Sequence, residues 1–270
     1  MVKIALDAGH GINTPGKRSP DGEREWSFNN AVILACIERL NTYQDVQILR
    51  LDDPTGKTDV SLVARVKKAN DWGADALVSA HHNALKAVWG NHGGVETFVS
   101  NNASKASVEL ANIINPQIVD AMGLRNRGVK RADWYMVRYS KMPAILTEGG
   151  FMDSTTDITA LRDSEKLKAQ GYAIADGLAA YFGLKAKKNN KPTGGITVNT
   201  PSNRGIGIVE ILDNTVLRKE PTYTSSIIRN LNAGEKYVVY ALENGWFNGG
   251  GDQWIFAKHT RFMPNSDTKI

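Results

Sequence analysis

The sequence has very little cysteine and no long apolar run, and both shortages exclude classes of protein. Among its 270 residues Cys36 is the only cysteine, so an intramolecular disulfide is excluded. Its apolar surroundings (AVILACIERL) predict a buried packing residue, with a cysteine nucleophile as the alternative. No apolar stretch reaches the roughly 18 residues that a membrane-spanning helix needs. We therefore expect no membrane insertion.

The first residues, MVKIALDAGHG, also lack the features of a secretory signal peptide. The apolar stretch is short and is interrupted by Asp7 and Gly9, so it predicts a first β-strand. We therefore expect a protein that is made in the cytoplasm without an export signal.

The charge balance is mildly basic. Lys and Arg number 33 against 28 Asp and Glu, which gives a net charge of +5. Such a surplus favours solubility or attracts a polyanion, either nucleic acid or the anionic polymers of a bacterial wall. No helix-turn-helix, RRM or zinc-finger spacing supports a nucleic-acid-binding protein, so no nucleic-acid partner is expected.

Strand-like and helix-like segments alternate over residues 1–183, which predicts an α/β domain with a parallel or mixed sheet. The apolar spacing predicts helices within 26–43, 61–73, 104–123 and 163–183. The strands are expected within 2–9, 45–53, 74–84, 93–100, 134–140 and 143–151. Gly73 is expected to end the second helix as a C-cap.

The composition changes after residue 183. Residues 184–203 are rich in Lys, Asn, Gly, Thr and Pro and predict a flexible linker. Residues 204–270 contain short strand-like segments and abundant Gly, which predict a small all-β barrel.

Two histidines follow predicted strands, where zinc hydrolases commonly place their ligands. His10, in DAGHG, is either a metal ligand or a turn histidine with a local hydrogen bond. His81 ends the third predicted strand. Because side chains alternate along a strand, Ser79, His81 and Asn83 share one face and His82 points to the other. His82 is therefore expected to be a surface or packing residue.

Two acidic positions complete the set of candidates. Glu25, just ahead of the first predicted helix, is either a ligand or a first-turn residue favoured by the helix dipole, and Glu23 is its rival. Glu148 ends an apolar strand, where a carboxylate is costly unless it is paired or functional. Beside a metal ion it would stay ionised and accept a proton from water.

The two remaining histidines have no partner motif. His92 lies in a Gly-rich loop and is either a plain surface residue or part of a substrate rim, and His259 is expected to have no functional role.

Four motifs in order, DAGHG, E-x-x-x-N (Glu25 to Asn29), S-x-H-x-N-A and PAILTEGGF, resemble the zinc-dependent N-acetylmuramoyl-L-alanine amidases of bacteria and phages, the Amidase_3 family. The resemblance covers residues 1–183 and includes Leu62-x-x-Arg65 and Gly94-x-Glu96-Thr97. One departure is that the family's Gly-Gly after DAGH is absent, and the loop here has the sequence Gly11-Ile12-Asn13-Thr14-Pro15-Gly16.

The resemblance implies that His10, Glu25 and His81 bind Zn²⁺ and that Glu148 is the catalytic glutamate, with Asn83 as a donor to the oxyanion. It also implies a twisted mixed sheet of about six strands flanked by helices. The expected reaction is hydrolysis of the amide bond between N-acetylmuramic acid and L-alanine in peptidoglycan. A zinc peptidase acting on the stem peptide would use the same ligands. A non-catalytic wall-binding protein would not need all four site residues.

The C-terminal segments resemble a bacterial SH3 domain, through Val216-Leu217-Arg218, Pro221, Gly234-Glu235 and Gly245-Trp246. This resemblance implies binding to wall peptide or polymer. Tyr223, Tyr237 and Tyr240 are candidates for a binding groove, whereas Trp246 and Trp254 are expected in the core of the barrel. A wall enzyme without a signal peptide would further resemble a phage or prophage endolysin, which needs a holin for its release.

Overall fold

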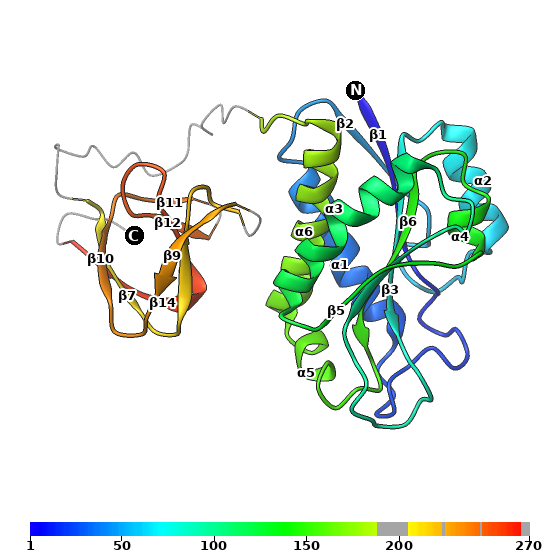
Figure 1. Cartoon of the computed structure of the whole chain (residues 1–270), viewed down its shortest axis with the longest axis horizontal. Helices are drawn as coiled ribbons and strands as arrows, with labels where there is room; N and C mark the ends of the chain where they lie inside the picture. Colours follow the sequence, from blue (N-terminus) through cyan, green and yellow to red (C-terminus); the bar gives the residue numbers. More distant parts are fainter. Residues whose placement is uncertain (188–204, 223–224, 244, 266–270) are drawn as a thin grey trace. The chain divides into compact units, whose positions relative to one another are not determined.

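The computed structural model describes residues 1–187, 205–222, 225–243 and 245–265 (Figure 1). The chain divides into two compact units, Met1–Lys187 and Lys188–Ile270, here called the first and the C-terminal unit. Within the described residues, no helix has both the length and the apolar character needed to cross a membrane.

The first unit is built on a six-stranded mixed sheet with the strand order β2-β1-β3-β6-β4-β5. The strands are β1 (Val2–Ala8), β2 (Val46–Arg50), β3 (Ala76–Asn83), β4 (Val95–Val99), β5 (Asn126–Arg131) and β6 (Ala144–Phe151). β1, β2, β3 and β6 run parallel, whereas β4 pairs with β6 in the antiparallel sense. The carboxyl ends of β1, β3 and β6 therefore meet at one edge of the sheet.

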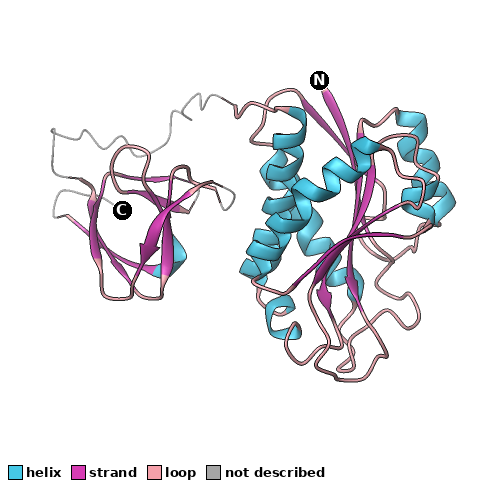
Figure 2. Cartoon of the chain, in the orientation of Figure 1, coloured by secondary structure: helices cyan, strands magenta, loops and turns pink. Residues whose placement is uncertain are grey.

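Helices cover both faces of this sheet, as Figures 1 and 2 show. They are α1 (Glu25–Leu40), α2 (Leu62–Trp72), α3 (Lys105–Met122), α4 (Tyr135–Arg138), α5 (Ile158–Leu161) and α6 (Ser164–Phe182). Ile4 and Leu6 of β1 pack with α1, α3 and α6, while Ala5 packs with α2 and α4 on the opposite face. Because both faces are covered, the central strands β1, β3 and β6 are almost wholly buried. The predicted mixed sheet flanked by helices is confirmed.

Local signals set the ends of α2. Ser61 caps its start by accepting a hydrogen bond from the Ala64 backbone N–H, and Gly73 ends it in a left-handed conformation with a φ of 67°. The expected C-cap at Gly73 is confirmed. Cys36 of α1 is fully buried, and burial raises the pKa of its thiol, so it is a packing residue.

One predicted strand is wrong. Residues 134–140 do not form a strand, because Tyr135–Arg138 is the short helix α4, which buries Met136 and Val137. The missing strand is β5, which has the polar sequence NRGVKR and no fully buried residue. β5 is an edge strand paired only with β4, so its sequence lacks the apolar alternation that signals a half-buried strand.

The first unit continues past its last helix. Gly183 ends α6 in a left-handed conformation. The Gln44 N–H then donates to Lys185 O (2.8 Å) and the Lys187 N–H donates to Thr42 O (2.7 Å). Residues 185–187 of the predicted linker are thus hydrogen-bonded to the chain after α1, and the Leu184 N–H donates to Ala179 O of α6. The rest of it, residues 188–203, lies outside the described residues.

The C-terminal unit contains β-strands and one short 3₁₀ helix in its described residues. They are β7 (Gly207–Ile211), β8 (Thr215–Arg218), β9 (Ile227–Leu231), β10 (Lys236–Val239), β11 (Ala241–Glu243), β12 (Trp246–Asn248), β13 (Trp254–Phe256), η1 (Ala257–His259) and β14 (Thr260–Pro264). They form a three-stranded and a five-stranded sheet around one apolar core. The expected all-β unit is confirmed.

The aromatic residues of this unit differ in exposure. Trp246 is buried as expected and packs on Phe256, whereas Trp254 is only half-buried. Tyr240 is exposed, and Tyr223 lies outside the described residues.

Candidate functional site

His10, Glu25 and His81 come together at the edge where β1 and β3 end. His10 Nε2 lies 3.3 Å from Glu25 Oε2, and His81 Nδ1 lies 3.0 Å from Glu25 Oε1. The two imidazole rings are 4.8 Å apart and perpendicular. One ligand atom from each residue lies within 4.8 Å of the other two, an arrangement that can hold a metal ion.

The flanking residues of the motifs explain how these three side chains meet. A Cβ at Gly9 would overlap the His81 imidazole, so only glycine lets that ring lie across the turn. Asn29, one helical turn after Glu25, donates from Nδ2 to Gly9 O (3.1 Å) and to Glu25 Oε1 (3.4 Å). The E-x-x-x-N motif therefore ties the start of α1 to the turn that carries His10.

The electrostatics of the cluster suit a cation. Burial by itself would raise the pKa of Glu25, but its close contacts with the two imidazoles outweigh burial and lower that pKa, so the carboxylate stays ionised. His10 Nε2 is buried and makes no hydrogen bond to a described residue. Two imidazole nitrogens and one carboxylate oxygen are a ligand set of catalytic zinc sites, which keep a fourth position open. The residues present therefore fit such a metal ion.

Glu148 lies directly beside this cluster on β6. Its Cα pairs in register with His81 of β3 on one side and with Glu96 of β4 on the other. Burial, and then repulsion from Glu25, raise the pKa of Glu148 well above its usual range, while the Lys17 ammonium opposes that rise. Glu148 Oε2 is buried and has no hydrogen-bond partner among the described residues. A carboxyl group whose pKa is raised in this way can serve as a general acid as well as a general base.

Asn83 is tied to the neighbouring strand. Its Nδ2 donates to Glu96 Oε1 (2.8 Å), and Glu96 Oε2 accepts from Arg127 Nε (2.8 Å). An amide Nδ2 carries two hydrogens, and one of them makes this hydrogen bond to Glu96.

His82 points away from the cluster, as the strand alternation predicts. It is buried between α1 and α6, where Nδ1 lies 2.8 Å from Asn29 Oδ1 and Nε2 lies 3.2 Å from Gln170 Oε1. Burial lowers the pKa of His82 to about 4, so its imidazole is neutral. His82 is therefore a packing residue, which is one of the two predicted alternatives, and not a surface residue.

Glu23 is held away from the cluster at the surface. Its carboxylate accepts hydrogen bonds from Arg162 Nε (2.7 Å) and from the Ser19 hydroxyl (2.7 Å). Glu25 is the residue that faces both histidines.

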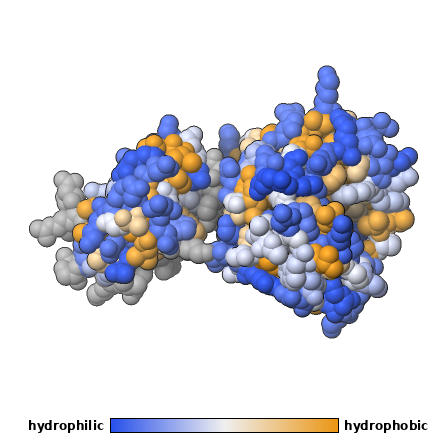
Figure 3. All heavy atoms as spheres, turned by 60° about the horizontal axis from the view of Figure 1, so that its bottom comes forward, coloured by the Kyte–Doolittle hydropathy of each residue, from blue (hydrophilic) through white to orange (hydrophobic). Residues whose placement is uncertain are grey.

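His92 belongs to the loop between β3 and β4, which is hydrogen-bonded to Asp153. It lies 2.7 Å from Asp153 Oδ1, and Asp153 also accepts from the backbone N–H groups of Leu85, Lys86 and Ala87. The same loop exposes Leu85, Val88 and Trp89. Figure 3, which brings the lower loops of Figure 1 forward, shows separate apolar patches on a mostly hydrophilic surface. His92 thus has a structural partner, which the sequence did not reveal.

Sequence reasoning also missed Lys17 as a neighbour of the site. Its Nζ lies 3.9 Å from Glu25 Oε2, and its charge acts on Glu148. A lysine in a loop between two ligand motifs carries no signal of its own, because only the closure of the loop brings it there. His259 lies in the C-terminal unit, 3.9 Å from Asp213 Oδ2.

Comparison with known proteins places these features in a family. The sequence profile of the family described as N-acetylmuramoyl-L-alanine amidase (Amidase_3) matches residues 4–180. The N-acetylmuramoyl-L-alanine amidase CwlM of Bacillus licheniformis is 36% identical over 187 residues, which cover 68% of this chain and 70% of the relative. The endolysin of Bacillus phage SPP1 is 30% identical over 212 residues, covering 73% of this chain and 75% of the relative.

A solved structure shares the fold of the first unit. It is the catalytic domain of CwlV, an N-acetylmuramoyl-L-alanine amidase from Bacillus (Paenibacillus) polymyxa var. colistinus. The match has a TM-score of 0.63 and 28% sequence identity, and it covers 68% of this chain and 100% of that domain.

Proposed function

The chain belongs to the N-acetylmuramoyl-L-alanine amidase family (Amidase_3), and on that basis we propose how its site works. It hydrolyses the amide bond between N-acetylmuramic acid and L-alanine in bacterial peptidoglycan and so degrades the cell wall. We propose that this activity depends on Zn²⁺ bound by His10, Glu25 and His81. The convergence of these three side chains around one point carries the proposal.

Glu148 is the proposed general base and acid. When bound, Zn²⁺ would lower the pKa of a water molecule and polarise the substrate carbonyl. Glu148, beside His81 and with Oε2 free, takes the proton as the water oxygen attacks the lactyl carbonyl carbon. It then gives that proton to the nitrogen of L-alanine as the C–N bond breaks. The other Asn83 amide hydrogen is proposed to donate to the oxyanion, which the hydrogen bond from Nδ2 to Glu96 supports by fixing the amide.

Mass spectrometry of digested walls tests the bond that is cut. An amidase leaves muramic acid with a free lactyl carboxylate and stem peptides that begin with a free L-alanine amine. The alternative, a zinc peptidase, leaves L-alanine on the sugar and cuts within the stem peptide. Products of the second kind alone would contradict the proposed reaction.

We propose that the C-terminal unit is an SH3-like module that binds wall peptide or polymer. The exposed aromatic Tyr240 supports this, since its ring lies beside Gly250, where a Cβ would be only 3.3 Å away. Exposed aromatic rings beside a glycine offer an apolar surface to a ligand. Tyr223 is proposed for the same surface from the sequence alone.

Residues 1–187 alone are expected to fold and to hydrolyse peptidoglycan, but to bind whole walls more weakly than the full chain. All the proposed catalytic residues lie in this unit, and a cut after Lys187 keeps its hydrogen bond to Thr42 O. A linked binding module raises the local concentration of enzyme at its substrate. The measurement is the fraction of protein that sediments with purified walls, compared for residues 1–187, residues 201–270 and the full chain. Equal binding of the truncated and the full chain, with no binding by residues 201–270, would rule out the anchoring role.

We also propose that the protein acts as an endolysin that needs a holin to reach the wall. Its similarity to the endolysin of Bacillus phage SPP1 supports this. Expression in a susceptible host should cause lysis only when a holin is coexpressed. Prompt lysis without a holin would contradict the proposal.

A further inference from the structure

The backbone of His10 adopts a conformation that a histidine does not favour. Its φ is 66°, in the left-handed region, which only three non-glycine residues occupy among those that the structure describes. There the Cβ crowds the backbone, so the surroundings have to hold the residue in place. Because φ sets the direction of the Cα–Cβ bond, this conformation decides where the imidazole points.

One buried guanidinium group holds this turn. Arg65 of α2 is only 1% exposed, and it uses all five of its N–H donors. Nη2 donates to His10 O (2.8 Å), and Nη1 donates to Ala8 O (2.8 Å) and to Asp7 Oδ1 (2.7 Å). The rigid plane of the guanidinium therefore fixes the carbonyl groups two residues apart, at His10 and at Ala8.

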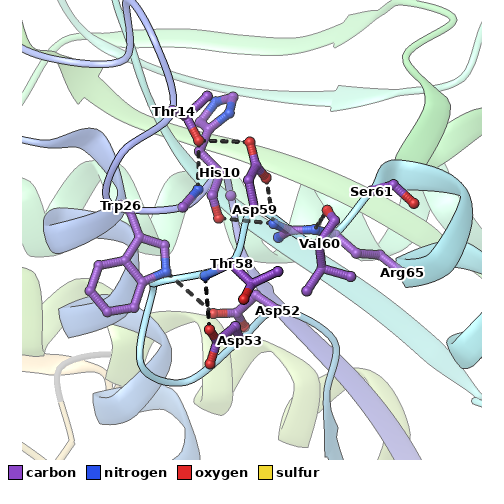
Figure 4. A network of polar contacts seen from close by, with 12 residues as sticks. His10, Thr14, Trp26, Asp52, Asp53, Thr58, Asp59, Val60, Ser61 and Arg65 are labelled. Atoms are coloured by element: carbon purple, nitrogen blue, oxygen red, sulfur yellow. Dashed lines mark hydrogen bonds and ion pairs between the residues drawn. The ribbon is translucent and has the colours of Figure 1, made fainter.

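The loop between β2 and α2 closes on the same turn, as Figure 4 shows. Asp59 accepts from Arg65 Nη2 (3.1 Å) through Oδ1 and from the Thr14 hydroxyl (2.6 Å) through Oδ2. The Thr14 Oγ1 in turn accepts from the Gly11 N–H (2.9 Å). The chain on both sides of His10 is thereby tied to Arg65 and Asp59.

A purely structural role, in which Arg65 only neutralises the buried Asp7, explains less of this geometry. Asp7 already accepts a hydrogen bond from the Ser79 hydroxyl (2.7 Å). Three of the five Arg65 hydrogen bonds go to backbone carbonyls, and one of these belongs to His10 itself. Neutralising Asp7 requires none of these three.

We propose that Arg65 is a positioning residue for the metal centre. With Asp59 and Thr14 it holds His10 in the left-handed conformation that directs its imidazole toward Glu25 and His81. The inference rests on the proposed metal site. It adds a residue of α2 that supports the ligand His10, whereas the ligand Glu25 lies in α1. Replacing a residue that supports a metal ligand typically costs about 10–100-fold in metal affinity or activity.

The test is the zinc affinity of the full chain, measured by competition with a chromogenic chelator. Arg65→Lys keeps the charge but cannot reach both carbonyls, so the zinc Kd is expected to rise about 10–100-fold. Asp59→Asn and Thr14→Val should raise it less. The matched control is Arg39→Lys, because the half-buried Arg39 pairs with Asp176 through Nε (2.7 Å) away from the site. It should lower Tm and leave the zinc Kd unchanged.

The outcomes separate this role from the metal site itself. Arg65→Lys could lower the Tm of the metal-free protein, as Arg39→Lys does, and still have the zinc Kd of the parent. That result would overturn the positioning role. If Arg65→Lys does not fold, the two milder variants decide, and parental zinc affinity in both overturns it. A parent protein that binds no zinc, or that keeps its zinc when Glu25 is replaced, would overturn the metal centre and this role together.

Discussion

Replacing Glu148 with Ala or Gln is expected to lower kcat by about 10²–10⁴-fold while zinc stays bound, which is the usual cost of losing a general acid or base. Gln keeps the size of the side chain but cannot accept a proton. Glu148 is buried with Oε2 free, and it is not one of the three clustered ligand candidates. The measurement is turnover on purified walls together with the zinc content of the same protein.

Asp176→Asn is the matched control for Glu148→Gln. Asp176 is also a buried carboxylate, but it lies in α6 and binds Arg39 at the end of α1 and the Tyr43 hydroxyl. Its replacement should cost stability and leave kcat unchanged. Near-parental turnover in Glu148→Gln would contradict the assignment of Glu148 as the general base and acid. Loss of zinc along with activity would instead make Glu148 a ligand.

Replacing Glu25 with Ala is expected to abolish both zinc binding and hydrolysis. Glu25 supplies the only negative charge among the three ligands and contacts both histidines. The zinc Kd should rise by more than about 100-fold, because the loss of a residue that merely supports a ligand already costs 10–100-fold. Chelation of the parent protein should likewise stop hydrolysis, and added Zn²⁺ should restore it.

Glu23→Ala is the control, since it removes an acidic residue two positions away. Glu23 pairs with Arg162 and faces away from the histidines, so this variant should keep its zinc and its activity. A Glu25→Ala protein that still holds zinc, or a parent that is fully active without metal, would refute the proposed centre. Loss of zinc in Glu23→Ala would restore Glu23 as the ligand.

The fold was largely predictable where local signals are strong. The alternation of apolar strands and amphipathic helices predicted the α/β unit, and Gly73 predicted the end of α2. The failure at β5 has a physical cause. β5 buries no complete side chain, and Val129 is the one apolar side chain in its sequence NRGVKR, so no alternation marks it as a strand. The apolar run of Tyr135, Met136 and Val137 in α4 resembles a short strand instead.

The sequence by itself determined the order of the motifs, the family that they resemble, and the separation of His81 from His82. Such features depend on neighbours along the chain and on the two-residue period of a strand. Only the tertiary structure brought Glu25, and not Glu23, against the two histidines. It also placed Lys17 beside the site and kept residues 184–187 with the first unit. It also showed that Arg65 holds His10 from 55 residues away. These contacts join segments that are distant in the sequence. A local sequence pattern does not show which distant residue will lie beside a given side chain in the folded chain.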